Sequence, residues 1–378
     1  MENSLSKSRL AVSTGFFVTG AVYGMIACRI PDLQRQVRLD DGQLGLALLF
    51  GSAGAMLGVA NAGRLCARKG SHVIMIAIGI AFCCLVALLG TTFSFWQMAS
   101  VCLCFGFCGG TMDVAMNING VAVEKLHERP IMSSLHGMFS LGGLASAAVG
   151  WLIVRSSVPF QFHFLGGAVV CVLLLLAIKR YVLPSTPDPD HVPPSFVMPE
   201  KAVLTIGVIC LCAFLCEGAM GDWSAIYLQK VLHETPSVST LGYFGFALTM
   251  TTTRFFGDAV LHRFGPTVTL RWSGLVTAVG LGLAILFPIT WLTIIGFSCV
   301  GLGMAIVAPI AFSVGGRLGG DNPDHAIASV ATMGYGAFLI GPALIGFIAK
   351  TSSLREAMIL VVVLSVVIVL LAGAAEKA

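Results

Sequence analysis

Twelve runs of about 20 largely apolar residues constrain this chain more than any other feature, because each is long enough to cross a bilayer as a helix. They lie near 10–28, 43–63, 73–92, 95–120, 131–154, 162–182, 201–226, 238–260, 267–288, 290–313, 326–349 and 353–373. Only 11% of the 378 residues are charged, whereas a soluble protein carries about 25%. So little charge cannot solvate a surface in water. We therefore expect an all-α integral membrane protein with twelve transmembrane helices.

The basic residues predict how the helices are oriented. With a cytoplasmic N-terminus, the cytoplasmic segments carry about twice as many Lys and Arg residues as the outer segments, as the positive-inside rule requires. The first outer loop, with Arg29, Arg35 and Arg38, is the exception. Met1–Arg9 leads into the first run without a cleavage site typical of a signal peptide, so we expect both termini in the cytoplasm. Tryptophans near the outer helix ends would form an aromatic belt: Trp96, Trp151, Trp223 and Trp291.

A proline-rich segment divides the chain. Leu183-Pro-Ser-Thr-Pro-Asp-Pro-Asp-His-Val-Pro-Pro-Ser195 can neither span a membrane nor pack as a helix. We predict an N-terminal six-helix bundle over 1–182, a cytoplasmic linker over 183–200 and a C-terminal six-helix bundle over 201–378.

The two halves resemble each other in sequence. A shift of 195 positions places Arg68 and Gly70 on Arg263 and Gly265, and a shift of 196 aligns Gly and Ala residues of spans four and five with those of spans ten and eleven. Equal helix numbers and one nearly constant offset indicate an internal repeat. Such repeats are typical of transporters whose two bundles face each other across a central cavity.

Two loops carry a glycine-plus-basic pattern, in Gly63-Arg-Leu-Cys-Ala-Arg-Lys-Gly70 and in Arg254-Phe-Phe-Gly-Asp-Ala-Val-Leu-His-Arg-Phe-Gly265. With these loops the chain resembles the major facilitator superfamily over essentially its whole length. The resemblance implies a two-bundle transporter in which gate or structural residues are Gly63, Arg68, Gly70, Arg254, Asp258, Arg263 and Gly265. The chain departs from the family pattern at Ala67, where an Asp is usual, and in span four, which lacks the usual Arg.

Three further stretches resemble the MosC-like branch, which is distantly related to the fucose permeases. They are Asp113-Val-Ala-Met-Asn-Ile-Asn-Gly120, Ser133-Ser-Leu-His-Gly-Met-Phe-Ser-Leu-Gly-Gly143 and Glu217-Gly-Ala-Met-Gly-Asp-Trp-Ser224. The branch implies a transporter of a small polar solute, such as a sugar-like compound. We expect the protein to lie in a cell membrane, the bacterial inner membrane. We expect a monomer whose partners are its solute and the bilayer, without nucleic acid.

An ionisable residue inside a span costs at least about 2.5–3.5 kcal/mol at the helix centre, so its presence needs a reason. Asp113 lies on a stripe of span four with Gly106, Gly110 and Asn117, which faces either a close helix or water. Asp113 either titrates or binds solute, or it is capped by neighbouring helices. His136 lies at a similar depth in span five, so the two could form a proton relay or a packed pair.

Span seven carries Glu217 and Asp222, which point in different directions because five residues of helix separate them. Glu217 lies deeper and is the better candidate for proton coupling. Asp222 and Trp223 are candidates for solute binding, with an outer gate and the aromatic belt as alternatives.

Other polar residues could bind a hydroxylated solute or hold helices together: Asn117, Asn119, Tyr227 and Tyr335. Arg254 and Asp258, four residues apart, are expected to form a structural pair or gate. Pro309 and Pro342 predict breaks or bends in spans ten and eleven.

The sequence contains no phosphate-binding loop in a strand–loop–helix context and no His-rich cluster, and its cysteines lie mostly in apolar runs. We therefore expect no cofactor, metal or disulfide, and transport driven by a proton gradient. The leading hypothesis is a proton-coupled symporter that works by alternating access. A proton-driven efflux antiporter is the alternative, and a membrane sensor or embedded enzyme is a third hypothesis.

Overall fold

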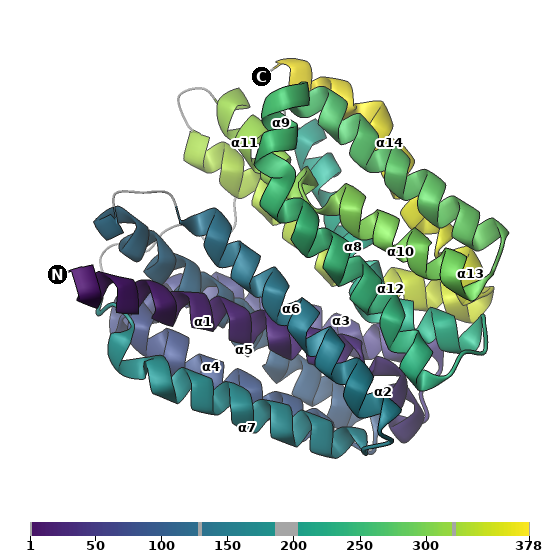
Figure 1. The fold of residues 1–378 in the computed structure, drawn as a ribbon, viewed down its shortest axis with the longest axis horizontal. Helices are drawn as coiled ribbons and strands as arrows, with labels where there is room; N and C mark the ends of the chain where they lie inside the picture. Colours follow the sequence, from purple (N-terminus) through teal and green to yellow (C-terminus); the bar gives the residue numbers. More distant parts are fainter. Residues whose placement is uncertain (1, 128–130, 186–202, 320–322, 378) are drawn as a thin grey trace. The chain divides into compact units, whose positions relative to one another are not determined.

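The structure is a computed structural model that describes residues 2–127, 131–185, 203–319 and 323–377 (Figure 1). These residues are predominantly helical, and no strand occurs among them. In chain order the elements are α1 (Glu2–Ala27), α2 (Ile30–Val37), α3 (Asp41–Lys69), α4 (Ser71–Leu89), α5 (Phe95–His127), α6 (Met132–Arg155), α7 (Phe160–Ile178), the 3-10 helix η1 (Lys179–Tyr181), α8 (Leu204–Lys230), α9 (Pro236–Leu286), α10 (Thr290–Met304), α11 (Val307–Leu318), α12 (Pro323–Thr351), α13 (Leu354–Ala357), α14 (Ile359–Leu371) and η2 (Ala372–Lys377).

Among the described residues, 11 helices are long and apolar enough to cross a membrane. The remaining expected span, 238–260, is the first part of α9 and is also helical. It is less apolar because it contains Arg254 and several threonines. The hydroxyls of Thr251 and Thr252 donate to the carbonyls of Ala247 and Leu248 one turn earlier, so they are satisfied inside the helix. The predicted all-α membrane fold is confirmed.

The chain forms two compact units, which are described separately below. Unit 1 comprises residues 1–38 and 50–195, and unit 2 comprises 39–49 and 196–378. Sequence reasoning had placed 39–49 in the N-terminal bundle, but these residues group with unit 2. Contacts within unit 2 explain the difference. Asp40 pairs with Lys350 at 3.1 Å. The backbone of Gly45 packs so closely against Pro342 that a Cβ at Gly45 would lie only 2.5 Å from the Pro342 carbonyl oxygen.

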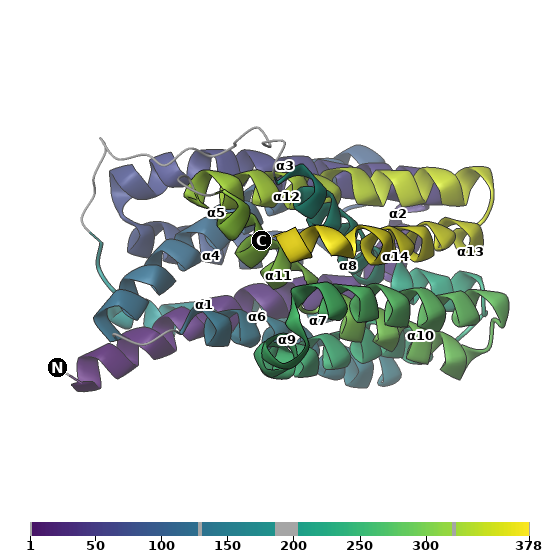
Figure 2. The same cartoon turned by 90° about the horizontal axis from the view of Figure 1, so that it is seen from above.

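Small residues allow close helix packing in unit 1. A Cβ at Gly106 of α5 would lie 1.7 Å from the carbonyl oxygen of Gly51 in α3, and one at Gly20 of α1 would lie 1.9 Å from that of Phe139 in α6. Figures 1 and 2 both show α1 and α6 side by side. Helix backbones approach this closely in membranes only where side chains are small. The α5 stripe predicted from the sequence therefore faces, at Gly106, a close helix neighbour.

In unit 2, α8 is buried at most positions and packs against α9, α11, α12 and α14. The predicted break of span ten is confirmed, because α10 ends at Met304 and α11 begins at Val307, with Pro309 in the first turn. Pro342 instead lies inside the continuous helix α12. Within α9, Gly265 has a non-helical backbone that separates two helical segments.

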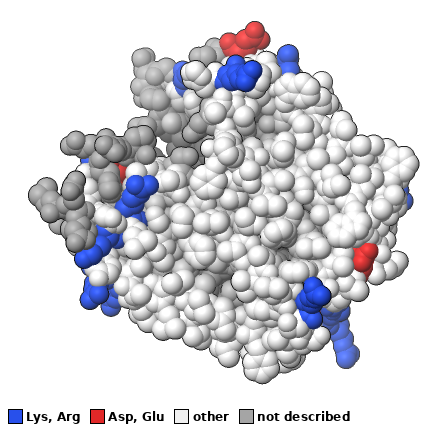
Figure 3. Space-filling model, viewed as in Figure 1, with Lys and Arg blue, Asp and Glu red and all other residues white. Residues whose placement is uncertain are grey.

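The face of the molecule in Figure 3 carries Lys, Arg, Asp and Glu only near its margins, and its middle is uncharged. Many large apolar side chains are exposed, such as Phe256 at 65% and Leu173 at 59%. Exposed apolar surface of this kind is compatible with lipid rather than water.

Candidate transport site

In unit 1, Tyr23 of α1 lies among aromatic rings and interacts with Asp113. Its ring contacts Phe82, Phe105 and Phe139, with ring centroids 5.4, 5.7 and 6.2 Å away. Its hydroxyl lies over Gly109 of α5, where a Cβ would be only 2.4 Å away. Tyr23 is also close enough to Asp113 to interact with it electrostatically. Sequence reasoning missed Tyr23, although a tyrosine within a span that also carries Gly20 and Gly24 was the available signal.

Asp113 and Asn117 lie on the same face of α5, as their spacing predicts. The side-chain amide of Asn117 donates to the Asp113 carbonyl at 2.8 Å and approaches its carboxylate at 3.4 Å. Both residues are half-buried. The Asp113 carboxylate thus lies beside an amide and interacts electrostatically with a phenol, and both groups hydrogen-bond hydroxylated solutes.

His136 of α6 is exposed, and its ring meets Phe16 edge-on at a centroid distance of 5.1 Å. Its expected contact with Asp113 stays a prediction. His136 lies three residues before Phe139, so it shares a helix face with one of the rings around Tyr23.

Asn119 is fully buried and contacts the chain that follows α7. Its amide donates to the Leu183 carbonyl at 2.8 Å and lies 3.5 Å from the Ser71 hydroxyl. The Ser185 hydroxyl in turn accepts from the Ser71 backbone N–H at 2.7 Å. In this structure Asn119 therefore anchors the start of the predicted linker to α4 and α5. The remainder of that linker, 186–200, lies outside the described residues.

In unit 2, Glu217 of α8 forms an ion pair with Arg254 of α9. The distance between Glu217 Oε2 and Arg254 Nη2 is 3.5 Å, and the side chains are 15% and 24% exposed. Arg254 Nε also donates to the Ala305 carbonyl at 3.4 Å. Glu217 Oε1 is buried and has no hydrogen-bond partner among the described residues. The side chain of Asp258, the expected partner of Arg254, lies outside the described set.

Asp222 is half-buried on α8, while Trp223 and Tyr227, which follow it, are buried in unit 2 with 0% and 1% exposure. A belt residue would have its ring at the lipid interface, so assigning Trp223 to the aromatic belt is wrong. Trp96 and Trp291, exposed at 70% and 64%, lie at the starts of α5 and α10, where belt residues are expected. Within the described part of the chain, Trp223 Nε1 and Tyr227 Oη have no hydrogen-bond partner.

Tyr335 of α12 is 38% exposed and belongs to an aromatic group on α8 and α12. Its ring lies 5.7 Å from that of Phe214, which stacks on Phe338 at 5.1 Å. Exposed aromatic faces bind planar or ring-shaped solutes well.

The two loops expected to carry the gate glycines and basic residues are mostly helical, and these residues lie within helices or at their ends. Gly63 is buried within α3, and Arg68 is exposed in its last turn. Gly70 precedes α4 with a φ of +84°, and Gly265 divides α9 with a φ of +73°. The guanidinium of Arg263 lies 5.4 Å from the ring centroid of Phe264.

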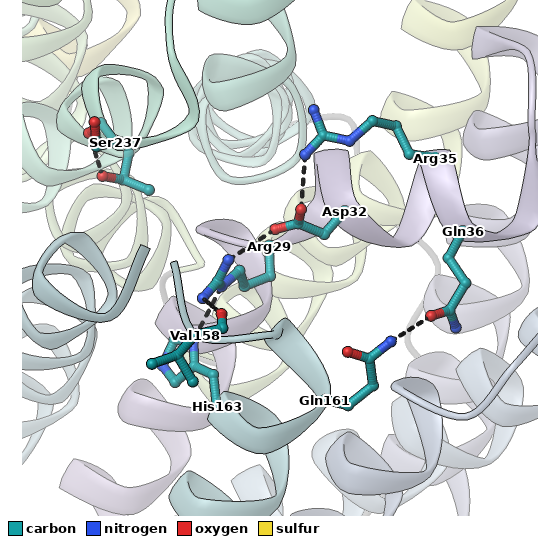
Figure 4. A network of polar contacts seen from close by, with 9 residues as sticks. Arg29, Asp32, Arg35, Gln36, Val158, Gln161, His163 and Ser237 are labelled. Carbon is teal, nitrogen blue, oxygen red and sulfur yellow. Dashed lines mark hydrogen bonds and ion pairs between the residues drawn. The ribbon is translucent and has the colours of Figure 1, made fainter. Parts of the chain in front are cut away.

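Figure 4 shows a polar network of unit 1 that the sequence did not reveal. Arg29, only 4% exposed, donates to Asp32 at 3.1 Å, to His163 Nδ1 at 3.2 Å and to the Val158 carbonyl at 3.2 Å. Arg35 also donates to Asp32, at 2.7 Å. The Asp32 carboxylate binds the guanidiniums of both Arg29 and Arg35. The net positive charge of this outer segment is therefore lower than its three arginines alone would suggest.

A second polar group missed by sequence reasoning lies at the start of α3, within unit 2. Asp41 pairs with Lys230, and Asp40 pairs with Lys350. Asp40 also accepts from the Gln43 backbone N–H at 2.8 Å, while the Gln43 side chain accepts from the Asp40 N–H at 3.1 Å, which makes a capping box. The Gln43 N–H and the Lys350 ammonium lower the pKa of the Asp40 carboxyl below its usual 3.8.

Comparison with known proteins decides the family. The sequence matches the model of the Major Facilitator Superfamily over residues 12–336. The chain belongs to this superfamily. Superfamily members are membrane transporters, so the protein is a multi-pass transporter of small-molecule solutes and not an enzyme.

Three relatives align with this chain over almost its whole length. An uncharacterized MFS-type transporter of Yersinia pestis is 35% identical over 92% of this chain and 91% of its own length. An uncharacterized transporter of Sinorhizobium fredii is 33% identical over 96% of both chains. The membrane protein MosC of Rhizobium meliloti is 29% identical over 95% of this chain and 88% of its own, which agrees with the resemblance found in the sequence.

Solved structures share the fold of this superfamily member. The nucleoside transporter NupG aligns with a TM-score of 0.77 and 12% identity over 98% of this chain and 99% of its own. The human organic anion transporter MFSD10 aligns with a TM-score of 0.66 and 16% identity over the same shares. At these identities the likeness concerns the fold.

Proposed function

We propose that this protein is a secondary active transporter that imports a small hydroxylated solute together with protons, by alternating access. The observation that carries the proposal is the Glu217–Arg254 pair inside unit 2. One carboxylate oxygen faces the cation at 3.5 Å, and the other is buried without a described partner. A carboxylate that is only half satisfied in a membrane can take up a proton or a solute donor at low cost.

Unit 1 offers a second carboxylate in a comparable setting. Asp113 lies beside Asn117 and within electrostatic reach of Tyr23. In this proposal Asp113 and Glu217 are the proton-coupling groups, with His136 as a relay. The candidates for solute binding are Asn117, Asp222, Trp223, Tyr227 and Tyr335. We further propose that the protein is a monomer of the bacterial inner membrane with both termini in the cytoplasm.

The chemistry of the candidate residues favours solutes that combine hydroxyl groups with an aromatic ring. Amide, phenol and carboxylate groups bind hydroxyls, while the partly exposed ring of Tyr335 offers an aromatic face. Sugars and inositols satisfy the first requirement. Nucleosides satisfy both, and the structural neighbour NupG is named as a nucleoside transporter.

The test is transport in liposomes that contain the purified protein. Counterflow of labelled sugars, inositols and nucleosides identifies the solute, and an inward proton gradient should then drive its accumulation. We expect Glu217→Gln to keep counterflow but to lose accumulation by at least about tenfold, as loss of a coupling group requires. Glu356→Gln, which changes an exposed carboxylate of α13, is the control and should behave as wild type.

Two outcomes would contradict this proposal. Accumulation by Glu217→Gln equal to that of wild type would remove Glu217 from coupling. Solute loss from the liposomes when protons enter would instead support the efflux antiporter.

A further inference from the structure

Three cations converge where α1 begins and α7 ends, within unit 1. The guanidinium of Arg180 lies 4.7 Å from the ring centroid of Tyr181, and the ammonium of Lys7, from α1, lies 5.6 Å from the same centroid. Lys179 is the third cation. Because Lys7 and Arg180 share one ring, their charges are held together instead of spreading apart into solvent.

These cations have no acidic partner in the part of the chain that the structure describes. The five ion pairs found there involve Arg29, Arg35, Lys230, Arg254 and Lys350. Lys7, Lys179 and Arg180 are all exposed. A group of like charges held this close favours an anion between or beside them.

Next to the cations lies an open hollow that two apolar and two basic residues line. The hollow has a volume of about 580 Å³, and the residues are Leu176, Ala177, Lys179 and Arg180. Leu176 also belongs to a stripe of exposed aliphatic side chains on α7 at helical spacing, with Val169 49%, Leu173 59% and Leu176 49% exposed. The site therefore combines an apolar track with a cationic end.

The depth of this site matches the edge of a bilayer. The stretch that is long and apolar enough to cross a membrane comprises α7 and η1 and runs from Phe160 to Tyr181. Lys179 and Arg180 lie in its last turn, where headgroups begin. Leu173 lies seven residues earlier, about 10 Å deeper at 1.5 Å per residue. Acyl chains would lie against the stripe while a phosphate meets the cations.

We propose that this site, formed by Lys7, Lys179, Arg180, Tyr181 and the aliphatic stripe of α7, binds an anionic phospholipid through its phosphate and acyl chain. A soluble phosphate would use only the cations, and a zwitterionic lipid would bring its own cation to them. Anionic lipid is the one membrane component that matches both the charge and the apolar track. The assignment is independent of the transported solute.

Arg155 provides a matched control. Its guanidinium lies 5.6 Å from the ring centroid of Trp151 at the last residue of α6, so it is an exposed, stacked arginine like Arg180. It is followed by Ser156 and Ser157 and has no neighbouring lysine in sequence. Arg38 is a second exposed cation, at the end of α2. Substituting both removes the same charge as substituting Lys179 and Arg180.

The experiment is native mass spectrometry of delipidated, full-length protein titrated with phosphatidylglycerol or phosphatidylcholine that have the same acyl chains. Wild type should bind phosphatidylglycerol in preference to phosphatidylcholine. Lys179→Gln/Arg180→Gln should weaken phosphatidylglycerol binding by about tenfold or more, while Arg38→Gln/Arg155→Gln should leave it unchanged. Thermal unfolding in phosphatidylcholine verifies that each variant is folded.

Several results would overturn the site. Equal binding of both lipids by wild type would do so, as would equal losses in the two double variants. Competition of inorganic phosphate with phosphatidylglycerol at similar concentrations would show an anion site that does not use the acyl chain. If Lys179→Gln/Arg180→Gln does not fold, the single variants Lys179→Gln and Arg180→Gln are measured against Arg155→Gln, with a smaller loss expected in each.

Discussion

Gly70 and Gly265, 195 positions apart, both adopt the left-handed backbone, with φ of +84° and +73°. They are the glycines with positive φ in the described part of the chain. Gly70 separates α3 from α4, and Gly265 separates the two segments of α9. The two halves thus repeat the same turn at the position where their sequences align.

Alanine at either glycine should destabilise the protein, because a positive φ combined with a ψ of 139° or 168° is a backbone region that essentially only glycine adopts. Another residue in this region costs about 1–3 kcal/mol. Gly70→Ala should cost more than Gly265→Ala. Its Cβ would lie 2.9 Å from the His72 ring and the Ser185 carbonyl, whereas the Cβ at Gly265 would meet nothing within 4 Å. Thermal unfolding in detergent measures both changes.

Gly282 of α9 is the control for these variants, since it has ordinary helical geometry and open space around its Cβ position. Gly282→Ala should be neutral or stabilising by up to about 1 kcal/mol. Equal effects at Gly265 and Gly282 would contradict the role assigned to the left-handed backbone.

The close contact of α3 and α5 gives a second stability prediction. A Cβ at Gly106 would lie 1.7 Å from the Gly51 carbonyl oxygen, and backbone cannot move aside as a flexible side chain can. Gly106→Ala should therefore separate the helices and lower the melting temperature strongly, by the equivalent of about 3 kcal/mol or more. Gly166→Ala on α7, where nothing lies within 4 Å, should be harmless, and a similar loss in both variants would contradict this account.

The Glu217–Arg254 pair should respond asymmetrically to mutation. In Glu217→Gln, Arg254 keeps the Ala305 carbonyl as an acceptor. In Arg254→Gln, the Glu217 carboxylate loses its cation in a mostly buried position. We expect losses of about 1–3 kcal/mol, larger for Arg254→Gln. A double-mutant cycle measured by thermal unfolding should show coupling, and additive effects would mean that the pair contributes nothing to stability.

The sequence predicted the helices well because a membrane span is a local property of about 20 residues, and Gly265 and Pro309 marked their breaks through their own backbone preferences. Residue partners were harder to predict. Asp41 meets Lys230 across 189 positions, and Tyr23 reaches α5 and α6, contacts that no local pattern encodes. The position of Trp223 near a helix end favoured a lipid-facing ring, but the ring is fully buried.

The capping box at Asp40 should make stability depend on pH. The folded-state pKa of Asp40 is lowered by the Gln43 N–H and by Lys350. Its contribution is therefore fully present above the unfolded pKa near 3.8 and is lost as the pH falls through the lower folded value. Asp40→Asn should lower the free energy of unfolding by no more than about 1 kcal/mol at pH 7, because solvent weakens the interactions of an exposed carboxylate. The difference from wild type should shrink when the pH is lowered toward 3, and a constant difference would contradict the assignment.

Two substitutions of Trp223 distinguish a role in packing from a role in solute binding. Its ring is fully buried, and Nε1 has no described hydrogen-bond partner. Trp223→Ala should cost about 3–5 kcal/mol because it leaves a large cavity. Trp223→Phe keeps most of the ring and removes an unpaired donor, so its melting temperature should remain close to that of wild type. The exposed Trp291 is the control, and Trp291→Ala should cost little.

Counterflow then tells whether Nε1 contacts solute. If Trp223 binds solute through this donor, Trp223→Phe should weaken solute affinity by about tenfold at unchanged stability, since a solute acceptor would be left without its hydrogen bond. Unchanged affinity together with unchanged stability would limit Trp223 to packing. In that case the solute-binding role in unit 2 would rest on Asp222 and Tyr335, whose side chains are less buried.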